Sequence, residues 1–263
     1  MPAKRTSRPK SRRASGQRLS CIASYLGRVP YREAWDLQQQ LAEAVASGEQ
    51  PPTILLLEHP PTYTFGRRGH AEHLLWSQSE LESRGIEVHW VDRGGDVTYH
   101  GPGQLVGYPL IPLGKVDADG RLPNPDYIGY LRRLEATLIR GLAHYGLQGE
   151  QLEGLTGVWV SPSETQQGPD LAGSDQFSKI AAIGVKVDAR GISRHGFALN
   201  VNPDMSYWQG IIPCGLEGKP VIRMADLLPD PPPLPEIARV VADEFSDVFG
   251  LDIEWQDSIQ PPN

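Results

Sequence analysis

Apolar residues recur three or four positions apart in several segments of the chain, which is the spacing of an amphipathic helix. The clearest case is residues 127–145. A second helix is expected to begin after Pro30 and to end before Gly48, and a third spans residues 234–249. We also expect a helix at residues 71–84. Each of these helices presents an apolar face that must pack against a sheet or another helix.

Shorter apolar runs, alternating or continuous, predict strands. In chain order they are residues 19–25, 53–58, 86–91, 105–113, 156–160, 179–187, 192–201 and 251–255. The runs at 179–187 and 192–201 are separated by a short polar turn and indicate a hairpin. Strands and helices are interspersed without strict βαβ alternation. The pattern therefore favours an α+β fold, a mixed central sheet flanked by helices.

Composition changes this picture little. The 263 residues include 39% hydrophobic and 22% charged residues, which is typical of a folded soluble protein. No apolar run approaches the roughly 20 residues that a membrane-spanning helix requires. The two cysteines, Cys21 and Cys214, lie far apart and no secretory segment precedes them. We therefore expect free thiols in a reducing compartment.

Basic residues are concentrated in residues 1–18, which contain Lys and Arg but no Asp or Glu. This Ser-, Arg- and Pro-rich composition predicts a disordered tail. A solvated arm, a nucleic-acid-binding extension and an organellar transit peptide all share the bias, and the solvated arm is the preferred interpretation. We expect a basic tail (1–18), a single catalytic domain (19–255) and a flexible tail (256–263). We expect the protein to be cytoplasmic, with organellar import as the alternative.

A polar, glycine-rich segment at residues 93–104 separates two strand-like runs. Its sequence, RGGDVTYHGPGQ, combines glycines with Arg93, Asp96, His100 and Gln104. Glycine lets a backbone approach a ligand closely, and binding residues concentrate on loops that a rigid scaffold positions. An ordinary turn between strands needs only about two to five residues. We therefore predict that residues 93–104 form a binding loop.

Cys214 and Lys179 are candidates for covalent chemistry. Cys214 lies between a proline and a glycine, which favours a fixed non-helical turn, and it can be a nucleophile or an inert thiol. Alternation places Lys179 on the same side of its strand as Ile183 and Val185. A partly buried lysine can stabilise a thiolate or act as a base, although a strand-end lysine can equally reach into water.

Histidines offer a competing arrangement. His195 supports a Cys–His pair as a rival to the Cys–Lys pair. Neither His100 nor His195 has further ligands at metal-site spacing, so we predict no metal site.

Three segments in this order resemble the lipoyl(octanoyl) transferase family, the octanoyl-[acyl-carrier-protein]:protein N-octanoyltransferases. They are residues 93–104, residues 179–184 (KIAAIG) with 195–201 (HGFALNV), and residues 213–215 (PCG), after a similar lead-in at 58–67. The likeness spans about residues 20–250 and implies the fold of the biotin/lipoate protein ligases. The one unusual feature is the insertion-like stretch 161–178.

The same match implies roles for individual residues. Cys214 would be the nucleophile that carries an acyl thioester, and Lys179 would tune the pKa of that thiol and could act as a base. The residues implied to bind the octanoyl group are Arg93, Gly94, Gly95, Asp96, Val97, Thr98, Tyr99, His100, Ala182, Ile183, Gly184, Gly196, Phe197 and Ala198.

The resemblance implies transfer of an octanoyl group from octanoyl-acyl-carrier protein to a specific lysine of lipoyl domains, in protein lipoylation. Expected acceptors are the lipoyl domains of 2-oxoacid dehydrogenase complexes and the glycine cleavage H protein. No cofactor is expected, because a thioester is already activated and no nucleotide-binding motif is present. We expect a monomer that binds neither membranes nor nucleic acid. Acidic carriers would dock on Arg67, Arg68, Arg93 and Arg194.

Three other activities stay open. An ATP-dependent lipoate or biotin protein ligase on the same fold would make an acyl-adenylate and would not require Cys214. A non-catalytic acyl-binding protein would form no covalent adduct. A thioesterase would release free octanoate at the same rate with or without a lipoyl domain.

Overall fold

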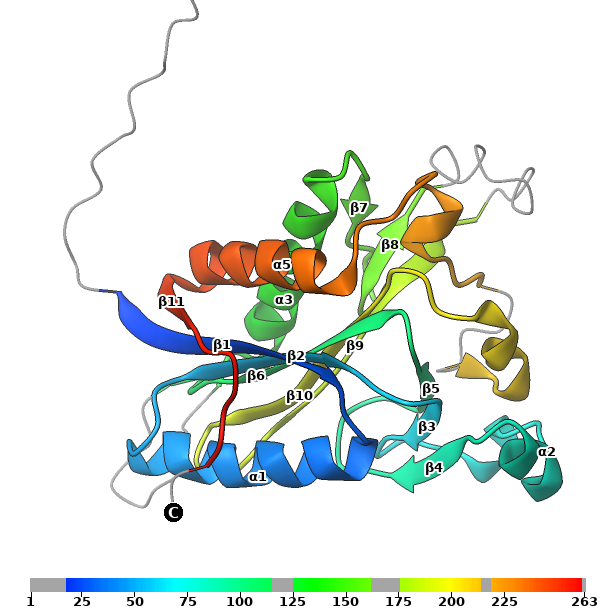
Figure 1. The fold of residues 1–263 in the computed structure, drawn as a ribbon, viewed down its shortest axis with the longest axis horizontal. Coiled ribbons are helices and arrows are strands. Elements are labelled where there is room, and N and C mark those ends of the chain that lie inside the picture. The colour runs from blue at the N-terminus through cyan, green and yellow to red at the C-terminus, as the bar shows by residue number, and fades with distance from the viewer. Residues whose placement is uncertain (1–17, 115–124, 162–175, 214–218, 262–263) are drawn as a thin grey trace, which may run out of the picture.

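The computed structural model describes residues 18–114, 125–161, 176–213 and 219–261. Within these ranges an eight-stranded sheet forms the centre of the molecule (Figure 1). Its order is β11 (Leu251–Trp255), β1 (Leu19–Arg28), β2 (Thr53–Glu58), β6 (Gln104–Leu110), β10 (Ser193–Asn200), β9 (Ser178–Val187), β8 (Val158–Val160) and β7 (Gly149–Glu150). β1 runs parallel to β11 and β2, while the other neighbouring pairs are antiparallel.

Helices cover both faces of this mixed sheet (Figure 1). α3 (Tyr127–Ala143) and α5 (Leu234–Phe249) pack against each other on one face, and α1 (Tyr31–Ser47) lies on the other. The predicted α+β class, a mixed central sheet flanked by helices, is confirmed.

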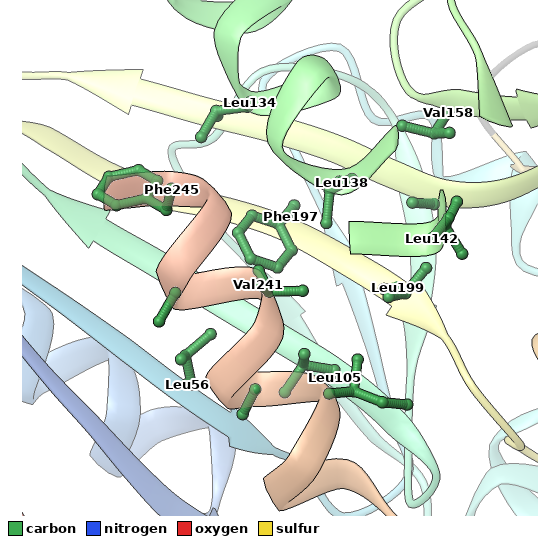
Figure 2. Packing of buried hydrophobic residues seen from close by; sticks show 14 of the residues in the cluster. Leu56, Leu105, Leu134, Leu138, Leu142, Val158, Phe197, Leu199, Val241 and Phe245 are labelled. Carbon is green, nitrogen blue, oxygen red and sulfur yellow. The ribbon is translucent and has the colours of Figure 1, made fainter. Parts of the chain in front are cut away.

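The larger core lies between α3, α5 and the sheet (Figure 2). Leu138 of α3 and Val241 of α5 pack with Phe197 and Leu199 of β10, and all four side chains are buried. Burial of an apolar side chain of this size contributes about 1.5–3 kcal/mol. This packing holds β10 and its neighbour β9 in place, and these two strands carry much of the predicted site.

A smaller sheet lies at one end of the molecule (Figure 1). It contains β4 (Glu87–Trp90), β3 (Thr62–Phe65) and β5 (Val97–His100), with β3 in the middle. Tyr63, Phe65, Val97 and Tyr99 form a separate core there together with Ile211. The short helices of the described chain are η1 (Ala71–His73), α2 (Gln78–Ser83), η2 (Met205–Gly210) and η4 (Met224–Asp226).

The prediction of one continuous helix at residues 71–84 is wrong. The chain forms η1 and then α2, and between them Leu75 N donates a hydrogen bond to Gly210 O at 2.8 Å. Ser77 then starts α2 with a capping box, in which Ser77 N donates to Glu80 Oε2 at 2.8 Å. A tertiary contact and a local cap therefore divide a segment whose apolar spacing alone predicts a single helix.

We predicted that residues 93–104 form a loop. The prediction is wrong in part, because this segment contains the strand β5. β5 pairs antiparallel with β3, a strand that the apolar pattern did not predict. Pairing with a partner distant in sequence satisfies backbone groups that the local pattern leaves open. α1, β2, α5 and β11 match their predicted bounds, and the other predicted elements are observed with shifts of a few residues.

Several expectations fall on residues outside the described ranges, namely most of the basic tail, most of residues 161–178, and Cys214. Near the carboxyl end, Gln256 N donates to Ala23 O at 2.9 Å and Ile259 is buried in the core beneath α1. No helix in the described part of the chain has both the length and the apolar character needed to cross a membrane.

Candidate active site

Two adjoining cavities lie where the small sheet meets β9 and β10. The outer cleft has a volume of about 720 Å³ and contains Lys179 in its wall. The inner pocket is much smaller, about 50 Å³. Gly94, Gly95, Ile183 and Gly184 line both cavities, so the two meet at these residues.

Most of the predicted octanoyl-binding residues meet at the inner pocket. Its wall includes Arg93, Gly94, Gly95, Thr98, His100, Ala182, Ile183, Gly184, Gly196, Phe197 and Ala198. The β9–β10 pairing explains how two distant motifs meet, because Ala182 is opposite Ala198 and Gly184 is opposite Gly196.

Three predicted binding residues lie elsewhere. Val97 and Tyr99 are buried in the core of the small sheet. Asp96 lines the outer cleft. Successive side chains of a strand point to opposite faces, so in β5 only Thr98 and His100 face the inner pocket.

Arg93 is buried and fixed by hydrogen bonds. Its Nε and Nη2 donate to Thr64 Oγ1 at 3.2 and 2.9 Å, and Nη2 also donates to Thr64 O at 2.5 Å. The guanidinium lies against glycines: a Cβ on Gly66 would be 2.8 Å from Arg93 Nη1, and one on Gly184 would be 3.2 Å from Arg93 Cδ. Arg93 therefore shapes the pocket wall as a buried cation.

A chain of hydrogen bonds continues from Thr64 through the wall of the pocket. Thr64 Oγ1 donates to His100 Nε2 at 3.3 Å, and His100 Nδ1 donates to Gln104 Oε1 at 2.9 Å. Gln104 Nε2 then donates to Asn200 Oδ1 at 2.9 Å, and Asn200 Nδ2 donates to Ile222 O at 3.0 Å. Burial lowers the pKa of His100 well below its usual value, which is consistent with a neutral ring that donates from one nitrogen and accepts at the other.

The sequence did not indicate three other residues of this region. Tyr31 and Tyr108 line the inner pocket. His59 supports Tyr108, because the Tyr108 hydroxyl donates to His59 Nε2 at 2.7 Å and His59 Nδ1 donates to Val29 O at 2.7 Å. His59 lies in the lead-in segment 58–67, which was a usable signal. Tyr31 follows Pro30 at the start of α1 and carries no local signal.

His195 also lines the inner pocket. Its backbone has φ of 55°, a left-handed conformation that is uncommon for a residue other than glycine. His195 Nε2 donates to Asp92 Oδ1 at 2.8 Å, and Arg194 Nη2 donates to Asp92 Oδ2 at 2.7 Å. The hydrogen bond from His195 and the charge of Arg194 hold the pKa of the Asp92 carboxyl well below its usual range.

Lys179 is partly buried at the start of β9, and its Nζ lies 4.6 Å from the centroid of the Trp159 ring. Such a cation–π contact favours the charged ammonium. The backbone of Lys179 pairs with the segment after residue 218: Lys179 N donates to Pro220 O at 2.9 Å, and Ile222 N donates to Lys179 O at 2.9 Å.

Residues on both sides of the undescribed segment 214–218 lie beside the outer cleft. Before it, Ile212 N donates to the backbone oxygen of His73, a cleft residue, at 2.9 Å. After it, Pro220 pairs with Lys179. The distance between Cys214 and Lys179 is outside what the structure describes, so the Cys–Lys and Cys–His predictions stay predictions.

We predicted that Arg93 is part of a basic docking surface for the acyl carrier. This is wrong, because Arg93 is buried. Arg194 is largely buried as well, and Asp92 pairs with its charge. Arg67 and Arg68 are exposed and line the outer cleft, as does Lys186. The cleft therefore keeps a positive rim, smaller than expected. Among the described residues, no group of three or more His, Cys, Asp or Glu side chains is arranged to hold a metal ion.

Comparison with known proteins relates this chain to one family. A model of the lipoyl protein ligase A/B catalytic domain matches residues 30–246. A protein of Chloroflexus aurantiacus named octanoyltransferase is 44% identical over 229 residues, covering 87% of this chain and 93% of that protein. An octanoyltransferase of Rubrobacter xylanophilus is 45% identical over 225 residues, covering 85% and 91%.

Solved structures show a similar fold. A bipartite lipoate protein ligase from Thermoplasma acidophilum, described with its E2 lipoyl domain, has a TM-score of 0.68 at 16% identity and covers 92% of this chain and 89% of that one. A lipoate-protein ligase A bound with ATP has a TM-score of 0.64 at 15% identity, covering 91% and 90%. At this identity the likeness extends to the fold alone.

Proposed function

The chain belongs to the lipoyl protein ligase A/B catalytic domain family and is an acyltransferase, and on this premise we propose that it transfers an octanoyl group from octanoyl-acyl-carrier protein to a lysine of a lipoyl domain. The observation that carries this proposal is a small inner pocket that adjoins a larger cleft with Lys179 in its wall. Ala182 presents only a methyl group to the inner pocket, which favours an acyl chain there, and each buried methylene of that chain contributes about 0.8 kcal/mol.

The first half-reaction loads the enzyme. The Cys214 thiolate attacks the thioester carbonyl, a new C–S bond forms, and the carrier leaves as its thiol after taking up a proton. The ammonium of Lys179 favours the thiolate form of the nucleophile. The backbone N–H of Gly95 can stabilise the oxyanion where the two cavities meet, whereas the N–H of Gly94 donates to Val185 O at 2.9 Å.

The second half-reaction unloads it. The neutral amine of the acceptor lysine attacks the octanoyl thioester, a C–N bond forms, and the C–S bond breaks to return the thiolate. The nitrogen releases a proton to water as the amide forms, which balances the return of the thiolate. This is ping-pong covalent catalysis, and it needs no nucleotide because the acyl group arrives already activated.

The proposal extends to partners and organisation. The acceptors are the lipoyl domains of 2-oxoacid dehydrogenase complexes and the glycine cleavage H protein. Residues 19–255 form the single catalytic domain of a cytoplasmic monomer. A related structure is described together with an E2 lipoyl domain, which supports an acceptor of that class.

An intact-mass experiment tests this chemistry. After incubation with octanoyl-acyl-carrier protein, the enzyme should gain one octanoyl group, and Cys214→Ser should gain none. Addition of an apo lipoyl domain should discharge the adduct and octanoylate one lysine. An enzyme that gains no mass, or a Cys214→Ser variant that keeps full transfer activity, would refute the proposed mechanism.

The same assay distinguishes octanoyl transfer from the competing ligase activity, which a protein of this fold could also have, as the ATP-bound lipoate-protein ligase shows. A ligase would octanoylate the lipoyl domain from free octanoate only when ATP is present. We expect no product under those conditions.

A further inference from the structure

The carboxylate of Asp96 is held from three directions at the edge of the outer cleft. Its Oδ1 accepts hydrogen bonds from the backbone N–H of Val97 at 2.7 Å and of His70 at 3.2 Å. Its Oδ2 accepts a hydrogen bond from Nδ1 of His73. Asp96 is buried and does not face the inner pocket, so its polar atoms serve contacts within the protein.

His73 is the last residue of the short helix η1, which also contacts residues 211–213. The backbone oxygen of His73 accepts a hydrogen bond from Ile212 N at 2.9 Å. The next residue, Leu74, forms an antiparallel bridge with Ile211. Residues 211–213 lead directly to Cys214, the nucleophile of the proposed function.

Asp96 also follows Gly95, which lines both cavities. The Asp96 carboxylate thus links the wall of the inner pocket, where the acyl chain is proposed to bind, to η1. In turn, η1 holds residues 211–213, which precede Cys214. We propose that Asp96, acting through His73, is a positioning residue that sets residues 211–213 relative to the acyl pocket. This inference rests on the proposed function, because the position of the segment has a catalytic consequence only if Cys214 is the nucleophile.

Positioning differs from substrate binding in what it changes. A residue that contacts the acyl group alters the Michaelis constant of the octanoyl carrier, whereas misplacement of a nucleophile lowers the rate of acylation with little effect on binding. Asp96 and His73 act as one unit, so removing either should remove the whole effect.

The test uses Asp96→Asn, His73→Phe and the double variant in the full chain. By NMR, hydrogen exchange of the Ile212 amide should become about tenfold faster in each variant, because the His73 oxygen no longer holds it firmly. In single-turnover measurements, acylation by octanoyl-acyl-carrier protein should slow about tenfold, with the Michaelis constant unchanged within about twofold. The double variant should be no slower than either single variant.

The His144–Glu244 pair gives a matched control, since His144 Nε2 donates to Glu244 Oε1 at 2.8 Å and neither residue lines either cavity. His144→Phe should leave Ile212 exchange and acylation unchanged. If Asp96→Asn fails to fold, His73→Phe decides the test, because the His73 side chain is 22% exposed.

Each outcome has one meaning. Wild-type exchange at Ile212, wild-type acylation, a change confined to the Michaelis constant, or additive losses in the double variant would overturn the positioning role. Failure of the wild-type enzyme to form an octanoyl adduct would instead refute the proposed function. The exchange measurement needs no substrate, so it reports on the Asp96–His73 link in either case.

Discussion

Buried imidazoles surround the inner pocket, and their surroundings keep them uncharged. Burial lowers the pKa of His59 to about 4 and also holds that of His100 well below its usual value. Both rings still make two hydrogen bonds each, one as donor and one as acceptor. They therefore act as neutral, shape-defining groups rather than as charges.

This arrangement predicts sensitivity to acid. In the unfolded chain His59 takes up a proton near pH 6.5, but in the folded protein it does so only near pH 4. The unfolded state binds more protons in that window, so stability falls with decreasing pH by about 1.4 kcal/mol per unit for each such group. Urea unfolding at several pH values should show this slope, and His59→Asn should flatten it. If the free energy of unfolding of the variant fell equally steeply with pH, the acid sensitivity would come from other groups.

The two cysteines should differ sharply in reactivity. Cys21 is fully buried in the core, and burial raises the pKa of its thiol to about 12. Iodoacetamide should therefore modify one thiol in the native protein, and Cys214→Ser should abolish that reaction. Lys179→Met should slow alkylation at neutral pH about tenfold, because the thiolate loses its neighbouring cation, while Lys179→Arg retains most of the rate. Equal alkylation rates in Lys179→Met and the wild type would show that Lys179 does not stabilise the Cys214 thiolate.

Among the elements, the paired strands β6 and β10 leave no space for a Cβ at Gly196 and Gly107. A Cβ on Gly196 of β10 would lie 2.1 Å from the backbone oxygen of Gly107 in β6. A Cβ on Gly107 would in turn lie 2.1 Å from the ring of Phe197. Glycine is required here because backbone atoms occupy the space of a side chain.

We expect Gly196→Ala to destabilise the protein by about 1–3 kcal/mol, since the new methyl group must push two strands apart. Gly94→Ala is the matched comparison, because its Cβ would approach nothing closer than 3.5 Å. Thermal unfolding of both variants tests this. Equal melting temperatures would show that the β6–β10 contact adjusts without cost.

For the molecule as a whole, the outer cleft carries positive charge on a protein with a formal net charge of −7. Arg67 and Arg68 remain available at its edge, whereas Arg93 and Arg194 are committed to internal contacts. A local positive rim on an acidic protein favours an acidic partner at that rim alone.

Reversing charge at Arg67 and Arg68 together should raise the Michaelis constant for the acyl carrier about tenfold, with little change in the turnover number. The effect should shrink as salt is added, because the charges are exposed. Arg239→Glu on α5, away from both cavities, is the control for a general change in charge. An unchanged Michaelis constant in the Arg67/Arg68 variant would place the carrier elsewhere.

The spacing of apolar residues in the sequence was sufficient to predict many of the helices and strands of this protein. Amphipathic periodicity determines α5 and β11, because each buries one continuous face and needs no information from distant segments. The motifs around Gly94, Ala182 and Gly196 likewise identified most of the pocket wall, since glycine and alanine are needed wherever a ligand or a backbone comes close.

Tertiary structure decided the remainder. Whether Thr98 or Tyr99 faces the pocket depends on the pairing of β5 with β3, a contact between segments that are far apart in sequence. Arg93 resembles a docking residue in the sequence, yet Thr64 and the neighbouring glycines bury it. The link from Asp96 to the segment before Cys214 exists only because η1 packs against both. Local patterns record which face of an element is apolar, whereas the partners of buried polar groups are chosen when distant segments meet.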